Sequence, residues 1–540
     1  MIKELKDLGG QLFNKRQGLL QFWQHTAENF YPERADFTVS RNSGDDFAKD
    51  VMSSYPARAR RDLGNLFSTM LKKTDFKMRT NKKDREDTLA RQWLEKATKI
   101  QVAAMTDRVA NLTRATKEGD HDVAAFGQCA ITTEINMAQN ALLYRCWHLR
   151  DVAWQENIEG KITTVFRKWK PTVSQLCKTF PKTVNSRVRD KLEKNPFDEV
   201  NVWHCIMPTE DYLQLHGVKP VRQPFVTIYI DVDNDTELEC VGSLIQPYTI
   251  PRWQTVTGSQ YAASPAVTAS ISDARAMQIM MQTILEAGEK AVNPPMIGYP
   301  QALRSDLQIF AGGFTAIDRE YDDRTGAAIK PLEQGKYGIP IGLELLDRTQ
   351  REISEAWFLN KLNLPPQGTE MTAYEASERV KEFVRNAMPL IQPLEAEYPA
   401  ALCENTFVLL MANGAFGDIR DIPQSIQGAD IQFIFESPLT EAEDRIKSGK
   451  FVEFVNILKT ASEIDPDASI VLDVKKAVRD TGLGSVPADW IRTEDAIEKI
   501  TAQRQAALEE QADLEAAAQE AMTAKAEGEA MKARGETVSG

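Results

Sequence analysis

The residues best placed to do metal chemistry are the acidic run Asp231-Val232-Asp233-Asn234-Asp235. Carboxylates at alternate positions are typical of a calcium-binding loop, which also needs a glycine at its sixth position and a glutamate at its twelfth. Here Thr236 stands at the sixth position and Gly242 at the twelfth. We therefore interpret the run as a polar turn between two strands and not as a calcium site.

Two neighbouring pairs, Cys146 with His148 and His204 with Cys205, are the candidates for a zinc site. A structural zinc ion needs about four converging ligands, which often come from C-x-x-C pairs. None of the six cysteines forms such a pair. We predict that the residues of both pairs are ordinary packing residues. We also predict that no metal or cofactor is bound and that no disulfide is needed.

Motifs for phosphate binding and for nucleophilic catalysis are incomplete. Gly449-Lys450 ends like a P-loop, but Phe451 follows where serine or threonine is needed, and Asp444 replaces the first glycine. Neither H-E-x-x-H nor G-x-S-x-G occurs, and the five histidines are too scattered to suggest a Ser/His/Asp group. The sequence predicts a protein that is not an enzyme.

Composition places the chain among globular proteins. It has 540 residues, 42% of them apolar, and a formal net charge of −13, which suggests two to four domains and argues against a protein that grips nucleic acid. Two basic runs, 58–61 and 167–170, are interpreted as solvated surface. No apolar run suits a membrane helix and no signal peptide is visible at the N-terminus, so we expect synthesis and residence in a reducing cytosol.

Helical periodicity predicts the elements that must position any site. Apolar residues recur at helical spacing over 5–30, 56–72, 87–115 and 342–362, and Ser264-Pro265 is typical of the start of another long helix that ends at Asn293-Pro294-Pro295. From about residue 122 to 256, after the third of these helical regions and before Ser264, lie runs typical of strands. The predicted strands are Ala130–Ile135, Lys161–Phe166, Pro224–Ile230 and Leu238–Ile245, and a glycine-rich, strand-like stretch follows over 296–338.

A further long helix is predicted to begin at the capping box Thr372-x-x-Glu375 and to end near Asn413-Gly414. Pro389, Pro393 and Pro399 fall inside it, and each interior proline removes one backbone hydrogen bond. We expect the helix to kink in its middle. A short strand should follow, then a small helical domain over 440–500, and an Ala/Glu-rich tail with helix propensity but little apolar surface.

A series of blocks between residues 20 and 445 occurs in an order that is more specific than any block alone. One block is Phe126–Ala130. It is similar to a Gly-Thr-Ala pattern at the start of a strand, but Gln128 and Cys129 depart from that pattern. The others are Gln21–Trp23 with Tyr31-Pro32, Val165–Arg167 with Thr172–Gln175, Tyr261–Pro295, Pro331–Gly335, Met371–Glu375 with Arg379, and Phe433–Thr440.

In this order the blocks resemble the portal, or head-to-tail connector, proteins of short-tailed, podovirus-type bacteriophages. The resemblance implies an α+β portal fold with long stem and wing helices, a small β-containing wing and clip, and a helical C-terminal crown. The implied divisions are 1–264 wing, 265–293 first stem helix, 294–338 clip, 339–362 second stem helix, 363–371 tunnel loop, 372–438 kinked wing helix and strand, 439–493 crown, and 494–540 helical barrel or disordered tail.

The resemblance also implies a ring of about twelve subunits around a channel through which double-stranded DNA is packaged and ejected. Its partners would be the terminase, the tail adaptor, the major capsid protein and internal core proteins, with no membrane, at the head-tail vertex of a virion whose proteins are made in the host cytoplasm. The residues expected to face the channel are Lys361, Asn363, Gln367 and Thr369.

One alternative stays open on the sequence alone: an acidic helical scaffold or assembly protein without a DNA channel. Acidity and long helices fit both interpretations. The particle mass in solution separates them, because a portal forms a closed ring and a free scaffold does not.

Overall fold

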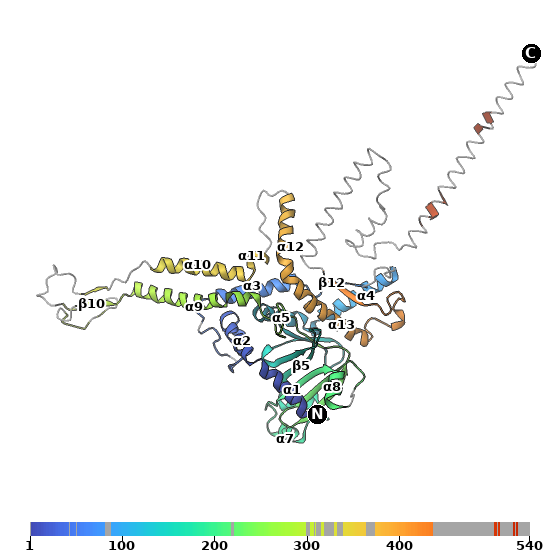
Figure 1. Cartoon of the computed structure of the whole chain (residues 1–540), viewed down its shortest axis with the longest axis horizontal. Helices are drawn as coiled ribbons and strands as arrows, with labels where there is room; N and C mark the ends of the chain where they lie inside the picture. The colour runs from blue at the N-terminus through green and yellow to red at the C-terminus, as the bar shows by residue number, and fades with distance from the viewer. Residues whose placement is uncertain are drawn as a thin grey trace, which may run out of the picture. The chain divides into compact units, whose positions relative to one another are not determined.

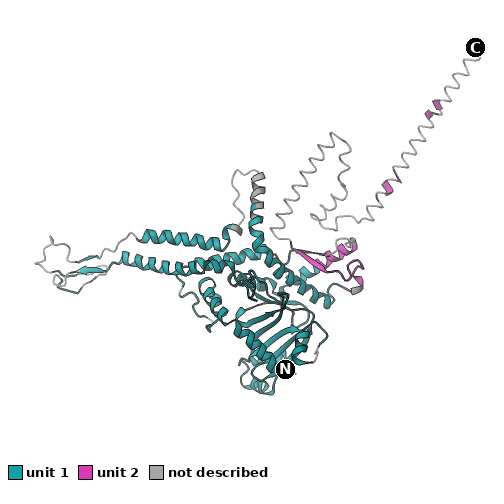
Figure 2. Ribbon diagram, in the orientation of Figure 1, with its two compact units in different colours: residues 1–76, 99–416, 435–446 teal, residues 77–98, 417–434, 447–540 magenta. Residues whose placement is uncertain are grey.

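In the computed structural model the chain separates into two units, coloured teal and magenta in Figure 2. Unit 1 comprises residues 1–76, 99–416 and 435–446, and unit 2 comprises 77–98, 417–434 and 447–540. Helices and small antiparallel sheets alternate along the chain, which confirms the predicted α+β class. The structure describes residues 2–42, 44–49, 51–80, 88–217, 221–298, 303–306, 308, 315–317, 329–331, 338–362 and 373–435, with a few positions between 500 and 526.

A five-stranded antiparallel sheet in the order β4-β5-β6-β7-β8 organises unit 1 (Figure 1). Neighbouring residues of β5 point to opposite faces, so Val165 packs into one apolar cluster and Phe166 into another. The strands predicted at Lys161–Phe166, Pro224–Ile230 and Leu238–Ile245 are present as β5, β7 and β8, whereas β4 and β6 are not predicted from the sequence. The strands are β4 (Val152–Glu156), β5 (Ile162–Trp169), β6 (Val202–Pro208), β7 (Phe225–Asp231) and β8 (Thr236–Ser243).

The N-terminal helix predicted over 5–30 is in fact two helices, α1 (Ile2–Lys15) and α2 (Gln17–Phe30). The chain breaks at Arg16, whose φ is −101° and ψ is 10°. The Arg16 guanidinium is buried and donates to the carbonyl oxygens of Leu149 at 2.5 Å and Val152 at 2.8 Å, and also to that of Arg150. Periodicity does not show the break, because the apolar positions keep helical spacing across it.

The two helices cover different faces of the five-stranded sheet. Leu5 and Leu12 of α1 pack with Phe166, while Trp23 of α2 packs on the other side with Trp154. Two short helices, α6 (Val173–Thr179) and α7 (Ser186–Lys194), enclose a third apolar cluster with the β6 and β8 strands, and α8 (Thr209–His216) follows β6.

A second region of unit 1 joins α3 (Tyr55–Met70) and α5 (Leu112–Phe126) to a three-stranded sheet. Its strand order is β3-β2-β9, where β2 is Ala130–Ile135, β3 is Leu142–Trp147 and β9 is Tyr248–Thr249. The helix predicted over 87–115 is interrupted: α4 (Thr88–Thr106) ends before Asn111, which has a left-handed φ of 56° and precedes α5.

Gly127 ends α5 in the left-handed conformation, with φ +75°. A Cβ at this position would lie 2.3 Å from the backbone carbonyl carbon of Ala263. The Gly127 carbonyl also accepts a hydrogen bond from the Trp253 backbone at 2.8 Å. Glycine is therefore required here both for its conformation and for the close approach of a second backbone.

Two long helices and a short one follow. α9 (Pro265–Val292) begins as predicted, with Ser264 Oγ accepting from the Val267 backbone at 3.5 Å. The predicted helix 342–362 is divided into α10 (Gly338–Ala356) and α11 (Leu359–Leu362) at Phe358, whose φ is 56°. Between α9 and α10, β10 (Met296–Gly298) pairs antiparallel with β11 (Ile329–Pro331).

The last described helices of unit 1 are α12 (Ala373–Glu395), a π-helical turn (Ala396–Ala400) and α13 (Ala401–Ala412). Unit 2 contains the first part of α4 and the two-stranded pair of β1 (Phe76–Thr80) and β12 (Ile431–Phe435), whose end residues Phe76 and Phe435 fall in unit 1. The strand predicted after the kinked helix is thus confirmed as β12.

The predicted crown, 439–493, lies outside the described residues, as does most of the clip and of the tail. The few described tail positions are helical. No helix that the structure describes is long and apolar enough to span a membrane.

Candidate functional site

The two helices predicted as a stem form a paired stalk in unit 1. α9 and α10 lie side by side and extend away from the sheets (Figure 1). Near the sheets the stalk is anchored by buried Trp357, whose Nε1 donates to Ser270 Oγ at 2.9 Å and whose ring centroid lies 4.9 Å from that of Phe30. A second anchor is reciprocal: Ser53 N donates to Gln278 Oε1 at 2.7 Å, and Gln278 Nε2 donates to Ser53 O at 3.0 Å.

Beyond these anchors the stalk leaves large apolar side chains exposed. The two helices are close enough that a Cβ at Gly342 would lie 3.3 Å from Ile284. However, Ile279 is 66% exposed and Val292 is 88% exposed. Exposed apolar residues gathered on two adjoining helices are typical of a surface that another chain covers. The other exposed residues of this kind are Leu285, Ile341, Leu343 and Leu345.

The loop expected to face the channel begins where the stalk ends. Lys361 belongs to the short helix α11, which the left-handed Phe358 turns away from α10. Asn363, Gln367 and Thr369 lie outside the described residues. The structure therefore fixes where the loop leaves the stalk and where it enters α12, and its contact with DNA stays a prediction.

The kink predicted from three prolines is present. α12 and α13 run in different directions (Figure 1), and the π-helical turn Ala396–Ala400 joins them. Pro389 and Pro393 lie inside α12, and Pro399 lies within the turn. A proline cannot donate its backbone hydrogen bond, which accounts for the local widening of the helix. The start of α12 at Ala373 agrees with the prediction, and Thr372, its expected cap, is outside the described residues.

Partly and fully buried polar contacts hold the bend in place. Glu397 accepts from the Arg252 backbone at 2.9 Å and from Arg252 Nη2 at 3.0 Å, while Arg252 also pairs with Glu156. The Tyr398 ring is fully buried and its hydroxyl donates to Thr116 O of α5 at 3.2 Å. The turn is therefore tied to both the sheet region and α5.

Beneath Tyr398 lies a buried ion pair. Lys73 Nζ lies 2.7 Å from Asp120 Oδ1 and 4.8 Å from the centroid of the Tyr398 ring. Ser68 Oγ donates to Asp120 at 2.7 Å. Burial raises the pKa of Asp120, and the nearby ammonium of Lys73 opposes that rise. The pair is thus a structural anchor, since its charges are compensated and enclosed.

The two basic runs interpreted as solvated surface are only partly so, and that prediction is wrong for one arginine in each. Arg60 is buried, donates to Phe30 O at 3.2 Å and lies 3.8 Å from the Tyr31 ring centroid. Arg167 is 3% exposed and donates to Tyr248 Oη at 2.8 Å. Their planar guanidinium groups stack on aromatic rings inside the subunit, which sequence charge alone does not show.

The residues with metal-like spacing act as structural groups. His148 Nε2 lies 2.7 Å from Asp36 Oδ1, while its Nδ1 accepts from the Arg150 backbone. His204 contacts Tyr248 Oη at 2.7 Å, and burial lowers its pKa well below the ordinary value, which keeps the ring neutral. Asp231 accepts two backbone donors in the turn between β7 and β8, as predicted. Among the residues that the structure describes, no three or more His, Cys, Asp or Glu side chains gather in a way that could hold a metal ion.

Comparison with known proteins decides the family. A family model described as "Bacteriophage head to tail connecting protein" matches residues 3–490. This chain belongs to that family. The connector is accordingly a structural, non-enzymatic protein of the phage virion, and the family, the location and the portal function predicted from the sequence are confirmed.

Two relatives are distant in sequence. The connector is 24% identical to the "Probable portal protein" of Bordetella phage BPP-1 over 469 residues, which cover 85% of this chain and 82% of that protein. It is 22% identical to the "Portal protein" of Salmonella phage epsilon15 over 325 residues, covering 59% and 57% of the two chains. The virion of a native gene transfer agent particle gives a TM-score of 0.34 at 11% identity, over 74% of this chain and 85% of that chain, too low to support an argument.

Proposed function

We propose that the connector forms a closed ring of about twelve subunits around a channel that passes double-stranded DNA during packaging and ejection. The exposed apolar surface of the stalk carries this proposal. Six large aliphatic side chains on two adjoining helices would stay in water in a lone subunit, and each gains about 1.5–3 kcal/mol when it is fully buried. A ring supplies a neighbour for every stalk. The exposed residues are Ile279, Leu285, Val292, Ile341, Leu343 and Leu345.

In this arrangement α9 and α10 are the stem, the β10–β11 pair belongs to the clip, and the sheets with α1–α8 form the wing. The kinked helix from α12 to α13 crosses the wing. Residues 363–371 form the tunnel loop, 439–493 the crown, and 494–540 a helical barrel within the head. These assignments extend the family membership to particular elements of this chain.

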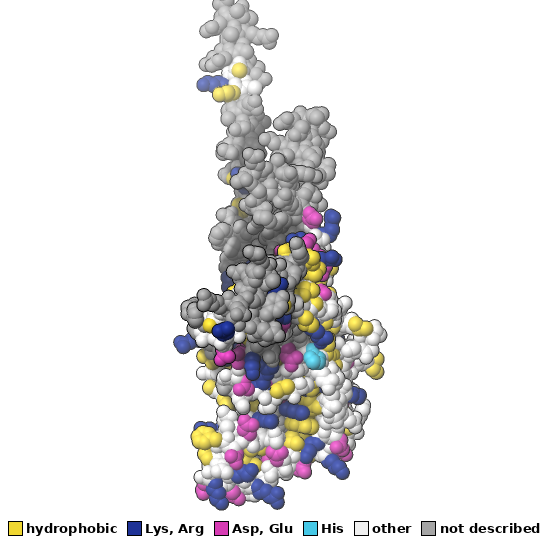
Figure 3. All heavy atoms as spheres, turned by 90° about the vertical axis from the view of Figure 1, so that its left-hand side faces the viewer, with side chains coloured by type: hydrophobic (Ala, Val, Ile, Leu, Met, Phe, Trp, Pro, Cys, Tyr) yellow, Lys and Arg dark blue, Asp and Glu magenta, His cyan; other side chains and the backbone are white. Residues whose placement is uncertain are grey.

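The net charge of the subunit supports a channel that lets duplex DNA pass without binding it tightly. The subunit carries a net charge of −13, and on the face shown in Figure 3 basic and acidic side chains are interspersed wherever the surface is described. A channel with six to ten lysine or arginine contacts to phosphate would bind DNA tightly and in a salt-dependent way. An acidic subunit whose described surface on that face mixes basic and acidic side chains favours sliding of the DNA.

The particle mass in solution tests the ring. Native mass spectrometry of the purified connector should give a closed assembly of about twelve 60.6 kDa chains. Substitution Ile279→Glu places a charge in the proposed stalk interface and should shift the mass toward smaller species. The matched control is Ile158→Glu, because Ile158 is fully exposed at a hairpin turn outside the stalk. A ring that tolerates Ile279→Glu, or a wild-type protein that never exceeds a dimer, contradicts the proposal.

The loop makes a separate test of the channel. We propose that Asn363, Gln367 and Thr369 touch DNA through polar groups, with Lys361 at the edge. Deletion of 364–368 should leave the ring mass unchanged and impair packaging or DNA retention. Unchanged packaging and retention would remove the loop from the mechanism without affecting the ring.

The position at the head-tail junction suggests which individual proteins the connector binds. We propose that the clip binds the tail adaptor and, during packaging, the terminase, while the wing meets the major capsid protein and internal core proteins.

For the C-terminal tail, an isolated 494–540 peptide should show little helix by circular dichroism, and the ring should protect this segment from protease. Rapid cleavage in the ring argues against a barrel.

A further inference from the structure

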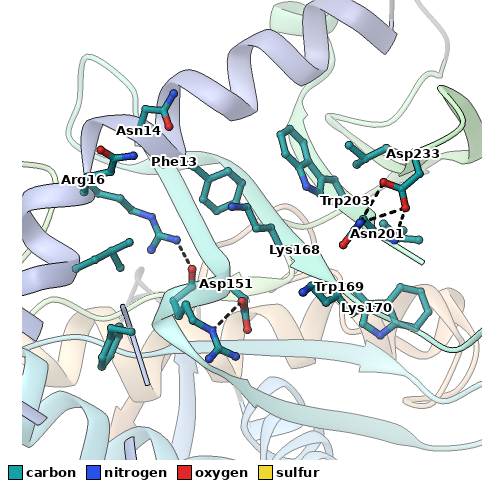
Figure 4. A pocket seen from close by; sticks show the side chains of 16 residues that line it. Phe13, Asn14, Arg16, Asp151, Lys168, Trp169, Lys170, Asn201, Trp203 and Asp233 are labelled. Carbon is teal, nitrogen blue, oxygen red and sulfur yellow. Dashed lines mark hydrogen bonds and ion pairs between the residues drawn. The ribbon is translucent and has the colours of Figure 1, made fainter. Parts of the chain in front are cut away.

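The break between α1 and α2 opens a pocket that the connector function does not use. It has a volume of about 510 Å3 and lies where α1 crosses the ends of β5 and β6 (Figure 4). Its apolar lining includes Phe13, Trp169 and Trp203, and the Phe13 and Trp203 ring centroids are 5.6 Å apart. We name this cavity the Arg16 pocket after the residue at the break.

Cations surround the aromatic lining. The Lys168 ammonium lies 4.1 Å from the Phe13 ring centroid and the Arg16 guanidinium lies 5.0 Å from it. Lys170 and Arg150 also line the cavity. Arg16 is only 2% exposed, and its Nε has no hydrogen-bond partner among the described residues.

The carboxylates of the pocket are engaged by Arg150 and Asn201 and not by its two lysines. Asp233 accepts from the side chain and backbone of Asn201 at 3.1–3.2 Å, and Asp151 pairs with Arg150 at 3.3 Å. Within the described parts of the chain, neither Lys168 nor Lys170 has a carboxylate partner. Partial burial lowers the pKa of Lys168, and the nearby Arg16 lowers it further, while Asp151 opposes this change. Burial likewise lowers the pKa of Arg16 to about 10.

An anion would relieve this repulsion, and the aromatic walls would receive a flat or apolar group attached to it. We propose that the Arg16 pocket binds a peptide segment of another protein that presents a carboxylate beside an aromatic side chain. Lys168 and Lys170 contact the carboxylate, while Phe13 and Trp203 pack against the ring. The volume falls within the 300–1,000 Å3 that is usual for pockets of this kind.

A peptide fits the pocket better than duplex DNA does. A duplex presents its phosphates on a convex surface and keeps its bases stacked inside, so it cannot fill a recessed aromatic cavity. A peptide side chain can enter while its neighbouring carboxylate stays at the basic edge. The occupant is therefore expected from a protein that meets the wing of the connector.

Matched small probes test the chemistry on the assembled connector. Ligand-observed NMR should show that N-acetyl-tryptophan, an aromatic carboxylate, binds about tenfold or more tightly than N-acetyl-tryptophan amide, which has the same ring without the charge. In the K168Q/K170Q double variant this difference should disappear. Both lysines are exposed, so the fold should be retained. The control is K161Q, because Lys161 lies just before β5, outside the pocket, and pairs with Glu159 at 3.4 Å.

Three outcomes overturn the proposal. Equal binding of the acid and the amide would remove the role of the carboxylate. A preference that persists in K168Q/K170Q, or is lost equally in K161Q, would place binding elsewhere. Tighter binding of AMP than of N-acetyl-tryptophan would assign the pocket to a nucleotide and not to a peptide. None of these outcomes bears on the ring mass, so the pocket and the proposed portal assembly fail or succeed separately.

Discussion

The stalk and the bend between α12 and α13 are both helical parts of unit 1, but they are held in opposite ways. At the bend, Tyr398 and the Lys73–Asp120 pair are buried and have partners within the same subunit. On the stalk, Ile279 is 66% exposed and Val292 is 88% exposed. The bend is thus held by contacts within the subunit, whereas in the proposed ring a neighbouring chain would cover the stalk.

This difference separates two kinds of mutational effect. A change at the bend or in the packed region around it should lower the free energy of unfolding of the subunit. A change on the outer stalk should alter assembly and leave subunit stability nearly unchanged. The predictions below test this separation, and they are ordered by their expected effect on the free energy of unfolding.

The largest effect is expected from Lys73→Met, which leaves the Asp120 carboxylate buried without its cation. Removing one partner of a buried ion pair typically costs about 3–5 kcal/mol. Urea unfolding of the unassembled subunit measures it. The control is Lys72→Met, because Lys72 is about a third exposed and pairs with Asp75 at the surface, so its loss should cost about 1 kcal/mol or less. Similar values for the two variants would show that the buried pair does not anchor the bend.

The next effect concerns Gly127→Ala. The alanine would adopt an unfavourable positive φ, and its Cβ would also collide with the backbone at Ala263. We expect a loss of about 3 kcal/mol. Gly217→Ala is a matched control, since Gly217 also ends a helix with φ +70° but has no atom within 4 Å of an added Cβ. That variant should lose only about 1 kcal/mol. Equal losses would mean that the backbone at Ala263 moves aside freely.

The sequence predicts the regular elements well because their signals are local. The strand Ala130–Ile135 and the start of the helix at Ser264-Pro265 agree with the structure, and three prolines predict the bend. For the strand, the helix start and the bend, neighbouring residues determine the backbone conformation. The ordered blocks also predict the family.

The breaks and buried arginines could not be predicted in this way. Arg16 ends a helix because its guanidinium reaches carbonyl oxygens more than a hundred residues away. Arg60 and Arg167 have ordinary basic neighbours, and only the fold places aromatic rings over them. Such contacts join residues that are far apart in the sequence, so the local sequence pattern does not indicate them.

A pH titration gives an effect of intermediate size in the packed region. Burial, followed by repulsion from Arg60, lowers the pKa of His121 to about 4 in the folded protein, from 6.5 in the unfolded chain. The folded state therefore binds fewer protons, and stability is lost as the pH falls from about 6.5 to 4. Because His121 is partly exposed, we expect about 1–2 kcal/mol and not the full shift.

The substitution His121→Gln isolates this contribution. Its free energy of unfolding should fall less steeply than that of the wild type between pH 6.5 and pH 4. Ile279 is 66% exposed, so a glutamate there should titrate alike in the folded and unfolded states, and Ile279→Glu should keep the wild-type slope between pH 6.5 and pH 4. A His121→Gln curve parallel to the wild type would assign the acid sensitivity to other groups.

The smallest effect on unfolding is expected from the stalk itself. Ile279 is 66% exposed in the subunit, so Ile279→Glu removes little buried apolar area and should change the free energy of unfolding by less than about 0.5 kcal/mol. The same substitution is expected to disrupt the ring. Urea unfolding of the unassembled Ile279→Glu subunit measures its stability, and the particle mass of the same variant measures its assembly. A large loss of subunit stability would show that Ile279 is already packed before assembly, and the contrast between stalk and bend would then disappear.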